Sequence, residues 1–119
     1  MFKVKVRNYW WDYCQETDEL KFPSLDSMWA HFVRLWQGRA YKTSLKPQGI
    51  IKDGDKERGY IELSSVLPMK CGRYGTLMIE EIECDGVIIY DRHYTSPKLL
   101  AYMREHDITK MAERPYGDF

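Results

Sequence analysis

The side chains best suited to nucleophilic or metal chemistry are three cysteines and three histidines scattered along the chain. They are Cys14, Cys71, Cys84, His31, His93 and His106. A catalytic thiol needs a base beside it, and structural zinc sites generally use two close pairs of ligands. A hairpin could bring Cys71, Cys84 and His93 together, but no Cys-x-x-Cys or His-x-x-x-His pair occurs. We therefore expect no enzyme, no bound metal and no cofactor.

Acidic residues form two runs, and these are the next candidates for acid–base work or magnesium binding. The runs are Asp12, Glu16, Asp18 and Glu19, and then Glu80, Glu81, Glu83 and Asp85. Carboxylates do such chemistry only when they are enclosed, and runs of this kind are usually solvated faces. Gly72 and Gly75 are not followed by the helix and lysine of a phosphate-binding loop. We interpret both runs as solvated surface.

A row of basic and aromatic residues near the N-terminus is the most suggestive binding feature. Period-two alternation predicts a strand over residues 2–10 with Lys3, Lys5, Arg7 and Tyr9 on one face, and Trp11 continuing the row. Such faces hold single-stranded nucleic acid in many proteins. The alternative is a charged outer face, which we favour because 18 basic residues balance 18 acidic ones. Further cations, namely Arg34, Arg39, Lys42 and Lys46, could extend the row.

Aromatic residues are abundant, with four tryptophans and nine tyrosines in 119 residues. One sheet covered by helices cannot bury them all, so we expect some to be exposed. Exposed aromatic rings beside arginines are typical of protein-binding hot spots. The candidate partner-binding residues are Lys3, Lys5, Arg7, Tyr9, Trp11, Arg39, Tyr41, Tyr74, Arg92 and Tyr94.

The first half of the chain supplies a strand and a helix to position these residues. Residues 12–21 are acidic and polar, and we expect a hairpin or a loop there. Ser24 is a natural helix cap, and Gly38 is a natural stop. Between them, apolar residues at spacings of three and four predict a helix that lies on a sheet: Leu25, Met28, Trp29, Phe32 and Trp36. We expect Trp29 and Phe32 to be buried.

The second half reads as strands followed by a helix. Residues 39–59 predict a short strand and an exposed loop, residues 60–67 a strand that ends at Pro68, and residues 70–75 a turn. Asp85 and Gly86 predict a tight hairpin between strands 76–84 and 87–91. Thr95 or Ser96 caps a helix that starts at Pro97. The predicted fold is one α+β domain over residues 1–119, with 113–119 a tail, in which an antiparallel sheet of about four to five strands carries two helices mainly on one face.

Composition also bears on location and assembly. The N-terminus alternates polar and apolar residues and is no signal peptide, and the longest apolar stretch, Val87 to Tyr90, is too short to span a membrane. An odd number of cysteines suits a reducing compartment. We expect a cytoplasmic protein that has no membrane partner. The zero net charge makes a homodimer a reasonable expectation.

Two segments resemble those of small accessory proteins of phages and conjugative elements. The first runs from Asp85 through Tyr90 to Pro97, and the second is the helix start from Phe22 to Ser27. The resemblance implies a non-enzymatic accessory protein that binds a protein partner. Its sharpest form is an anti-CRISPR inhibitor of a host defence nuclease, with an RNA-guided effector such as Cas9 as the partner. The alternative is an accessory protein that binds nucleic acid through the basic and aromatic face.

Overall fold

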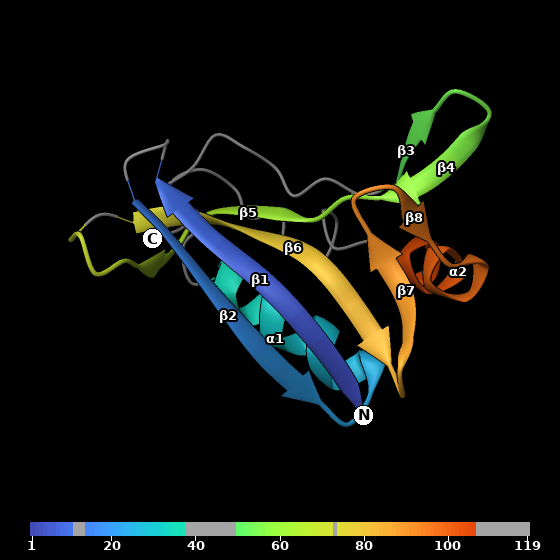
Figure 1. Ribbon diagram of the computed structural model, residues 1–119, viewed down its shortest axis with the longest axis horizontal. Coiled ribbons are helices and arrows are strands. Elements are labelled where there is room, and N and C mark those ends of the chain that lie inside the picture. Colours follow the sequence, from blue (N-terminus) through green and yellow to red (C-terminus); the bar gives the residue numbers. More distant parts are fainter. Residues whose placement is uncertain (11–13, 38–49, 73, 107–119) are drawn as a thin grey trace.

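An antiparallel sheet with two helices on one face forms the core of the computed structural model, which describes residues 1–10, 14–37, 50–72 and 74–106 (Figure 1). The elements are β1 (Phe2–Trp10), β2 (Cys14–Phe22), α1 (Leu25–Gln37), β3 (Ile50–Asp53), β4 (Lys56–Gly59), β5 (Glu62–Pro68), β6 (Tyr74–Cys84), β7 (Val87–Asp91), β8 (Tyr94–Thr95) and α2 (Pro97–Glu105). The predicted α+β class is therefore confirmed. The predicted tail over 113–119 and the stop at Gly38 lie outside the described residues.

The N-terminal hairpin occupies one side of the sheet. β1 pairs along its whole length with β2, from Phe2 opposite Phe22 to Trp10 opposite Cys14. Residues 14–22 therefore form a full strand, whereas the sequence was compatible with either a hairpin or a loop there. The residues of β1 that alternate with the predicted basic row form its inward face, because Val4, Val6 and Asn8 are buried.

The sheet branches along β6, which is its longest strand. Its first part pairs with β5, up to Met78 opposite Glu62, and its last part pairs with β7, from Ile82 opposite Tyr90. We call residues 79–81 of β6, which lie between these two pairings, the fork. On the other side of β6, Lys5 opposes Glu81 while Val6 opposes Ile79, so Glu80 is the extra residue of a β-bulge. Figure 1 shows β5 and β7 diverging from β6.

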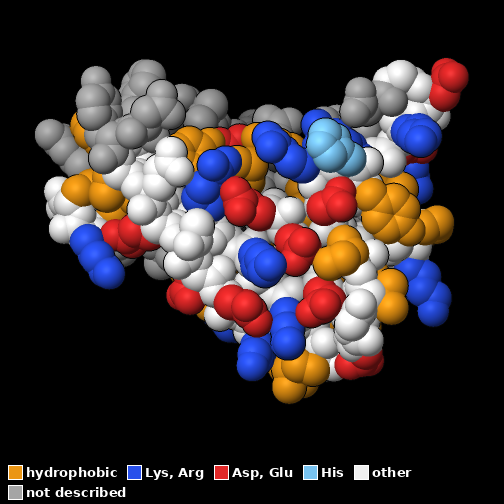
Figure 2. All heavy atoms as spheres, in the orientation of Figure 1, with side chains coloured by type: hydrophobic (Ala, Val, Ile, Leu, Met, Phe, Trp, Pro, Cys, Tyr) orange, Lys and Arg blue, Asp and Glu red, His pale blue; other side chains and the backbone are white. Residues whose placement is uncertain are grey.

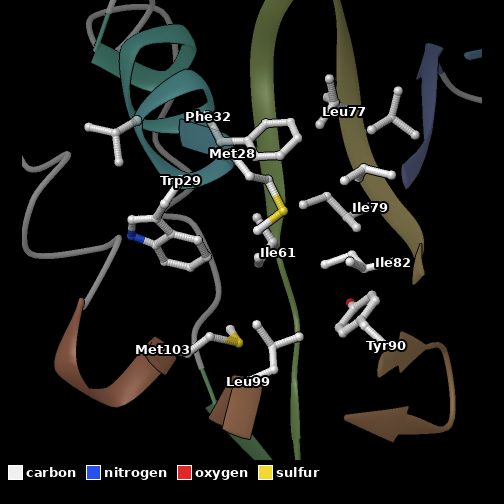
Figure 3. Packing of buried hydrophobic residues seen from close by; sticks show 13 residues of the cluster. Met28, Trp29, Phe32, Ile61, Leu77, Ile79, Ile82, Tyr90, Leu99 and Met103 are labelled. Carbon is white, nitrogen blue, oxygen red and sulfur yellow. The ribbon is translucent and has the colours of Figure 1, made fainter. Parts of the chain in front are cut away.

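The core lies between the inner sheet face and the helices. Figure 3 shows side chains of α1 and α2 meeting residues of β6 and β7 around Ile61. The predicted burial of Trp29 and Phe32 is confirmed, since they are 2% and 0% exposed. The other buried members of this cluster are Val4, Val6, Met28, Val33, Ile61, Leu77, Ile79, Ile82, Tyr90, Leu99 and Met103. Both helices therefore cover the same face, which leaves the opposite, outer face of the sheet uncovered by them.

The turns and caps follow the predicted chemistry. Asp85 and Gly86 have φ values of 48° and 88°, as a tight hairpin with positive φ at its centre requires. Ser96 caps α2, and its hydroxyl accepts a hydrogen bond from the amide of Leu99 at 3.2 Å. The hairpin of β3 and β4 is tied to the rest of the protein where the amide of Gly59 donates to the Thr95 hydroxyl at 2.8 Å. No helix in the described ranges has both the length and the apolar character needed to cross a membrane.

Candidate binding surface

The predicted basic row is present on the outer face of the sheet. Lys3 and Lys5 are exposed, while Arg7 and Tyr9 are partly buried by neighbouring strands. The alternation of β1 places them there, because Val4, Val6 and Asn8 point into the core. Sequence reasoning therefore located this part of the candidate surface correctly on the fold.

Carboxylates stand beside every cation of the row. Lys3 lies opposite Glu83, and Lys5 lies between Glu19 of β2 and Glu81 of β6. The Lys5 ammonium is 3.3 Å from the Glu81 carboxylate, and Nε of Arg7 is 3.0 Å from the carboxylate of Glu80. Figure 2 shows acidic and basic side chains interspersed over this face. The face is thus a mixed-charge surface and does not form a continuous positive track.

The bulge in β6 explains how two successive glutamates reach the same face. Neighbouring residues of a regular strand point to opposite sides, so Glu80 would normally face the core when Glu81 faces outward. The extra residue in the pairing turns Glu80 outward as well, where it meets Arg7. The acidic run that the sequence indicated as solvated surface therefore forms specific ion pairs with the basic row.

Tyr9 takes part in a hydrogen-bond network that joins β1 to β5 and to the residue Tyr60 just before β5. Its hydroxyl donates to Glu62 at 2.5 Å, and the Tyr60 hydroxyl donates to the other oxygen of the same carboxylate at 2.6 Å. Burial and the bond to Glu62 raise the pKa of Tyr9 to about 12, and the same causes raise the pKa of Tyr60. Both phenols remain protonated donors at neutral pH, so the network fixes β1 against β5. The Arg7 guanidinium lies over the Tyr9 ring, 5.3 Å from its centroid.

A depression of about 400 Å³ opens at the fork. Its lining comprises Lys5, Arg7, Arg58, Tyr60, Met78, Ile79, Glu80, Glu81, Tyr90, Asp91 and Arg92. Tyr90 is 2% exposed, and burial raises the pKa of its phenol. The depression exists because β5 and β7 leave β6 on either side of residues 79–81. It therefore combines arginine and tyrosine side chains with a stretch of strand that neither β5 nor β7 covers.

The turn between β7 and β8 forms one rim of this depression. Nη1 of Arg58 donates to the carbonyl oxygen of Arg92 at 2.8 Å, and Asp91 accepts the amide of His93 at 2.8 Å. These bonds hold the backbone of the turn. The Arg92 side chain is exposed, and its guanidinium forms no ion pair with any residue that the structure describes. Arg92 thus offers an available cation at the rim.

The remaining predicted residues do not all join this surface. Tyr94 is 48% exposed and lies beside a second shallow depression that Lys56 and His93 also line. Tyr74 begins β6, and its side chain is not described, while Trp11, Arg39 and Tyr41 lie outside the described residues. The expected extension of the row through Arg34 is wrong, because Arg34 belongs to α1, on the inner side of the sheet. Lys42 and Lys46 also fall outside the described ranges.

Sequence reasoning missed the residues that β4, β5 and β7 bring to the depression. In the depression they are Arg58, Tyr60, Tyr90 and Asp91, and beside it Glu62 accepts the hydrogen bond of Tyr9. Alternation placed Tyr60 and Glu62 on one face of a predicted strand, which was the available signal. Their closeness to β1 depends on the branching of the sheet, which has no local signature in the sequence.

The thiols and imidazoles show no enclosed catalytic arrangement in the described part of the chain. No three potential ligands among His, Cys, Asp and Glu come together there to hold a metal ion. His31 packs against the rings of Phe22 and Phe32, each at 5.3 Å between centroids, and burial together with nearby Arg34 lowers its pKa. His106 stacks on Tyr102 at 4.2 Å. These two histidines are parts of the packing.

Comparison of the chain with protein-family models, with curated proteins and with solved structures finds no match.

Proposed function

We propose that this chain is a non-enzymatic, cytoplasmic protein-binding domain whose contact surface is the outer sheet face around the fork. The observation that carries the proposal is the depression lined by arginine and tyrosine side chains, set among cations that already have carboxylate partners. Arginine and tyrosine are enriched in the energetic centres of protein interfaces. A surface of paired charges complements another mixed-charge protein surface more readily than it complements a polyanion.

The chemistry expected of the partner follows from the exposed cations at the rim of the depression. Arg92 supplies an available guanidinium, and Lys5 is 59% exposed although it is paired with Glu81. A partner segment that carries a carboxylate and an apolar or aromatic side chain would pair with Arg92 and enter the depression beside Tyr60. The proposed partner is therefore a protein with an acidic, partly apolar segment.

A defence nuclease of the host is the partner we propose to test first. The support is the resemblance of two segments to accessory proteins of mobile elements. In addition, a contact surface on this chain would be sufficient to cover, and so block, a surface of the nuclease. Such an inhibitor needs a complementary surface and no catalytic group. An RNA-guided effector such as Cas9 would lose target cleavage when the purified chain is present. Unimpaired cleavage by a panel of such effectors would contradict the proposal of nuclease inhibition. The broader proposal of protein binding would then be decided by the cross-linking experiment.

Site-specific cross-linking in bacterial cells tests the binding proposal. A photo-reactive benzophenone amino acid replaces His93, an exposed residue next to Arg92, and a matched control carries it at Ala30, an exposed position on α1. After irradiation and nuclease treatment, we expect one discrete protein adduct from position 93 and none from position 30. An adduct of twice the chain mass would identify the partner as a second copy. Equal labelling at both positions, or none at 93, contradicts the proposal.

Titration with labelled nucleic acid tests the alternative function directly. We expect no appreciable binding of single- or double-stranded DNA or RNA at physiological salt, because glutamates neutralise the basic row. If Lys3, Lys5 and Arg7 instead contacted three phosphates, the logarithm of affinity would fall with the logarithm of salt with a slope of roughly −2 on single strands. Micromolar binding with such a slope, lost in the variant Lys3→Glu, Lys5→Glu, Arg7→Glu, would establish the nucleic-acid function.

A further inference from the structure

Two cysteines that are far apart in the sequence lie close together at the end of the sheet where β2 begins. Cys14 is the first residue of β2, and Cys71 lies in the turn between β5 and β6. The Cys71 side chain is close enough to Cys14 to raise the pKa of the Cys14 thiol. Neither residue is in a disulfide bond, and because Cys71 is exposed and Cys14 is partly exposed, solvent and small reagents reach the pair.

Other contacts hold the two backbone segments next to each other. The amide of Lys70 donates to the carboxylate of Glu16 at 2.7 Å, which joins the residue before Cys71 to the strand that Cys14 begins. Tyr9 of β1 lies opposite Gln15 of β2 on one side and Thr76 of β6 on the other. The amide of Gly72 donates to the Met69 carbonyl oxygen at 2.9 Å and closes the turn around Cys71. The approach of the thiols is thus part of the strand pairing.

We propose that Cys14 and Cys71 are a modification site at which a two-electron oxidant closes an intramolecular disulfide. The third cysteine, Cys84, lies at the opposite end of β6 beside the Asp85 turn and cannot take part within the same chain. The bond would link the start of β2, an edge strand, to the turn between β5 and β6. It would therefore reinforce one end of the sheet under oxidising conditions and release it under reducing ones.

The reaction balances with a low-molecular-weight disulfide such as oxidised glutathione. The exposed Cys71 thiolate attacks one glutathione sulfur, and the other half leaves as a thiolate. Cys14 then loses its proton and attacks the Cys71 sulfur, which releases the second glutathione. Two protein thiols are oxidised, one disulfide reagent is reduced to two thiols, and the two protons pass to the released thiolates. Cys71 reacts first because it is the more exposed of the two thiols, and the neighbouring Cys71 raises the pKa of Cys14.

Mass spectrometry of the full chain treated with oxidised glutathione tests the site. We expect the loss of two hydrogen atoms, a cross-linked peptide that joins Cys14 to Cys71, and a Cys84 thiol that still reacts with an alkylating reagent. Because closing a long loop restricts the unfolded chain, we also expect the oxidised protein to melt about 5 °C or more above the reduced one. A glutathione adduct that persists on Cys71, or a bond that includes Cys84, would overturn the proposal.

Three variants separate this proposal from general thiol reactivity. Cys84→Ser should form the internal bond as readily as the unchanged chain. Cys14→Ser should stop at the mixed disulfide on Cys71 and show no rise in melting temperature. If Cys14→Ser fails to fold, Cys71→Ser, at an exposed position, replaces it and should acquire no internal bond. Covalent dimers as the main product of the unchanged chain would contradict the assignment.

Discussion

The two faces of the main sheet use one alternating pattern for different purposes. On β1, Val4 and Val6 face the helices and are buried, while Lys3 and Lys5 between them face outward and are exposed. The inner face gains stability from burial, which depends on area and little on the identity of each neighbour. The outer face consists of ion pairs and hydrogen bonds between named partners, which contribute little to stability at exposed positions. The comparison indicates that the inner face maintains the fold, so substitutions on the outer face should change stability less.

Among the tests of this comparison, truncation of a core aromatic residue should change the free energy of unfolding most. Phe32 is 0% exposed between α1 and the sheet, so Phe32→Ala leaves a cavity as well as losing burial. We expect a loss of about 3 to 5 kcal/mol in the free energy of unfolding. Urea denaturation followed by circular dichroism measures it. An unchanged midpoint would show that the inner face does not hold the fold in the described way.

A substitution at Gly75 should have a smaller effect on stability. At this position neighbouring residues approach the backbone of β6 closely. A Cβ atom at this position would overlap Sδ of Met69 and would lie 2.5 Å from Oδ1 of Asn8 and 2.9 Å from the Tyr9 carbonyl oxygen. Gly75→Ala should therefore cost about 1 to 3 kcal/mol through overpacking. Thermal unfolding provides the measurement. A variant as stable as the unchanged chain would mean that β1 and the start of β6 are farther apart.

An outer-face ion pair should contribute still less. In a double-mutant cycle of Lys5→Gln and Glu81→Gln, we expect a coupling free energy below about 1 kcal/mol. The coupling should shrink further at 1 M salt, because both side chains are partly or fully open to solvent. A coupling as large as the Phe32→Ala effect would contradict the division between the two faces.

The smallest effect we expect is a pH dependence that arises at His31. Its folded-state pKa is lowered, first by burial and then by Arg34, so the unfolded chain binds the proton more tightly. Stability should fall as the pH drops below the unfolded pKa of about 6.5, and the loss should be complete below the folded pKa. Denaturant midpoints between pH 7.5 and pH 5 measure it, with His31→Gln as the comparison. An identical pH profile for both proteins would contradict the assignment.

Local sequence signals were sufficient to predict the inner face and its turns. The apolar stripe through Met28, Trp29 and Phe32 indicated the buried side of α1, and Asp85 with Gly86 indicated the hairpin. These signals succeed because helix periodicity and positive φ are decided within a few residues. The outward position of Lys5 and Arg7 followed from the same alternation.

The candidate surface was less predictable because its residues meet through long-range register. Glu80 reaches Arg7 only because a bulge interrupts the alternation of β6. Arg58 and Tyr60 join the depression only because β5 and β7 diverge at the fork. The contact of Cys14 with Cys71 likewise depends on where β2 and the turn after β5 end. No short stretch of sequence encodes these long-range contacts.

The most direct test of the central claim compares two charge reversals in the affinity for the cross-linked partner. Arg92→Glu alters the rim of the fork depression, while Lys98→Glu alters another exposed cation, on α2, on the helix-covered side. Both variants should keep the unfolding midpoint of the unchanged chain. We predict that Arg92→Glu weakens binding at least tenfold, which corresponds to about 1.4 kcal/mol, and that Lys98→Glu leaves binding unchanged. Equal affinities for Arg92→Glu and the unchanged chain would contradict the claim that the outer face at the fork is the binding surface.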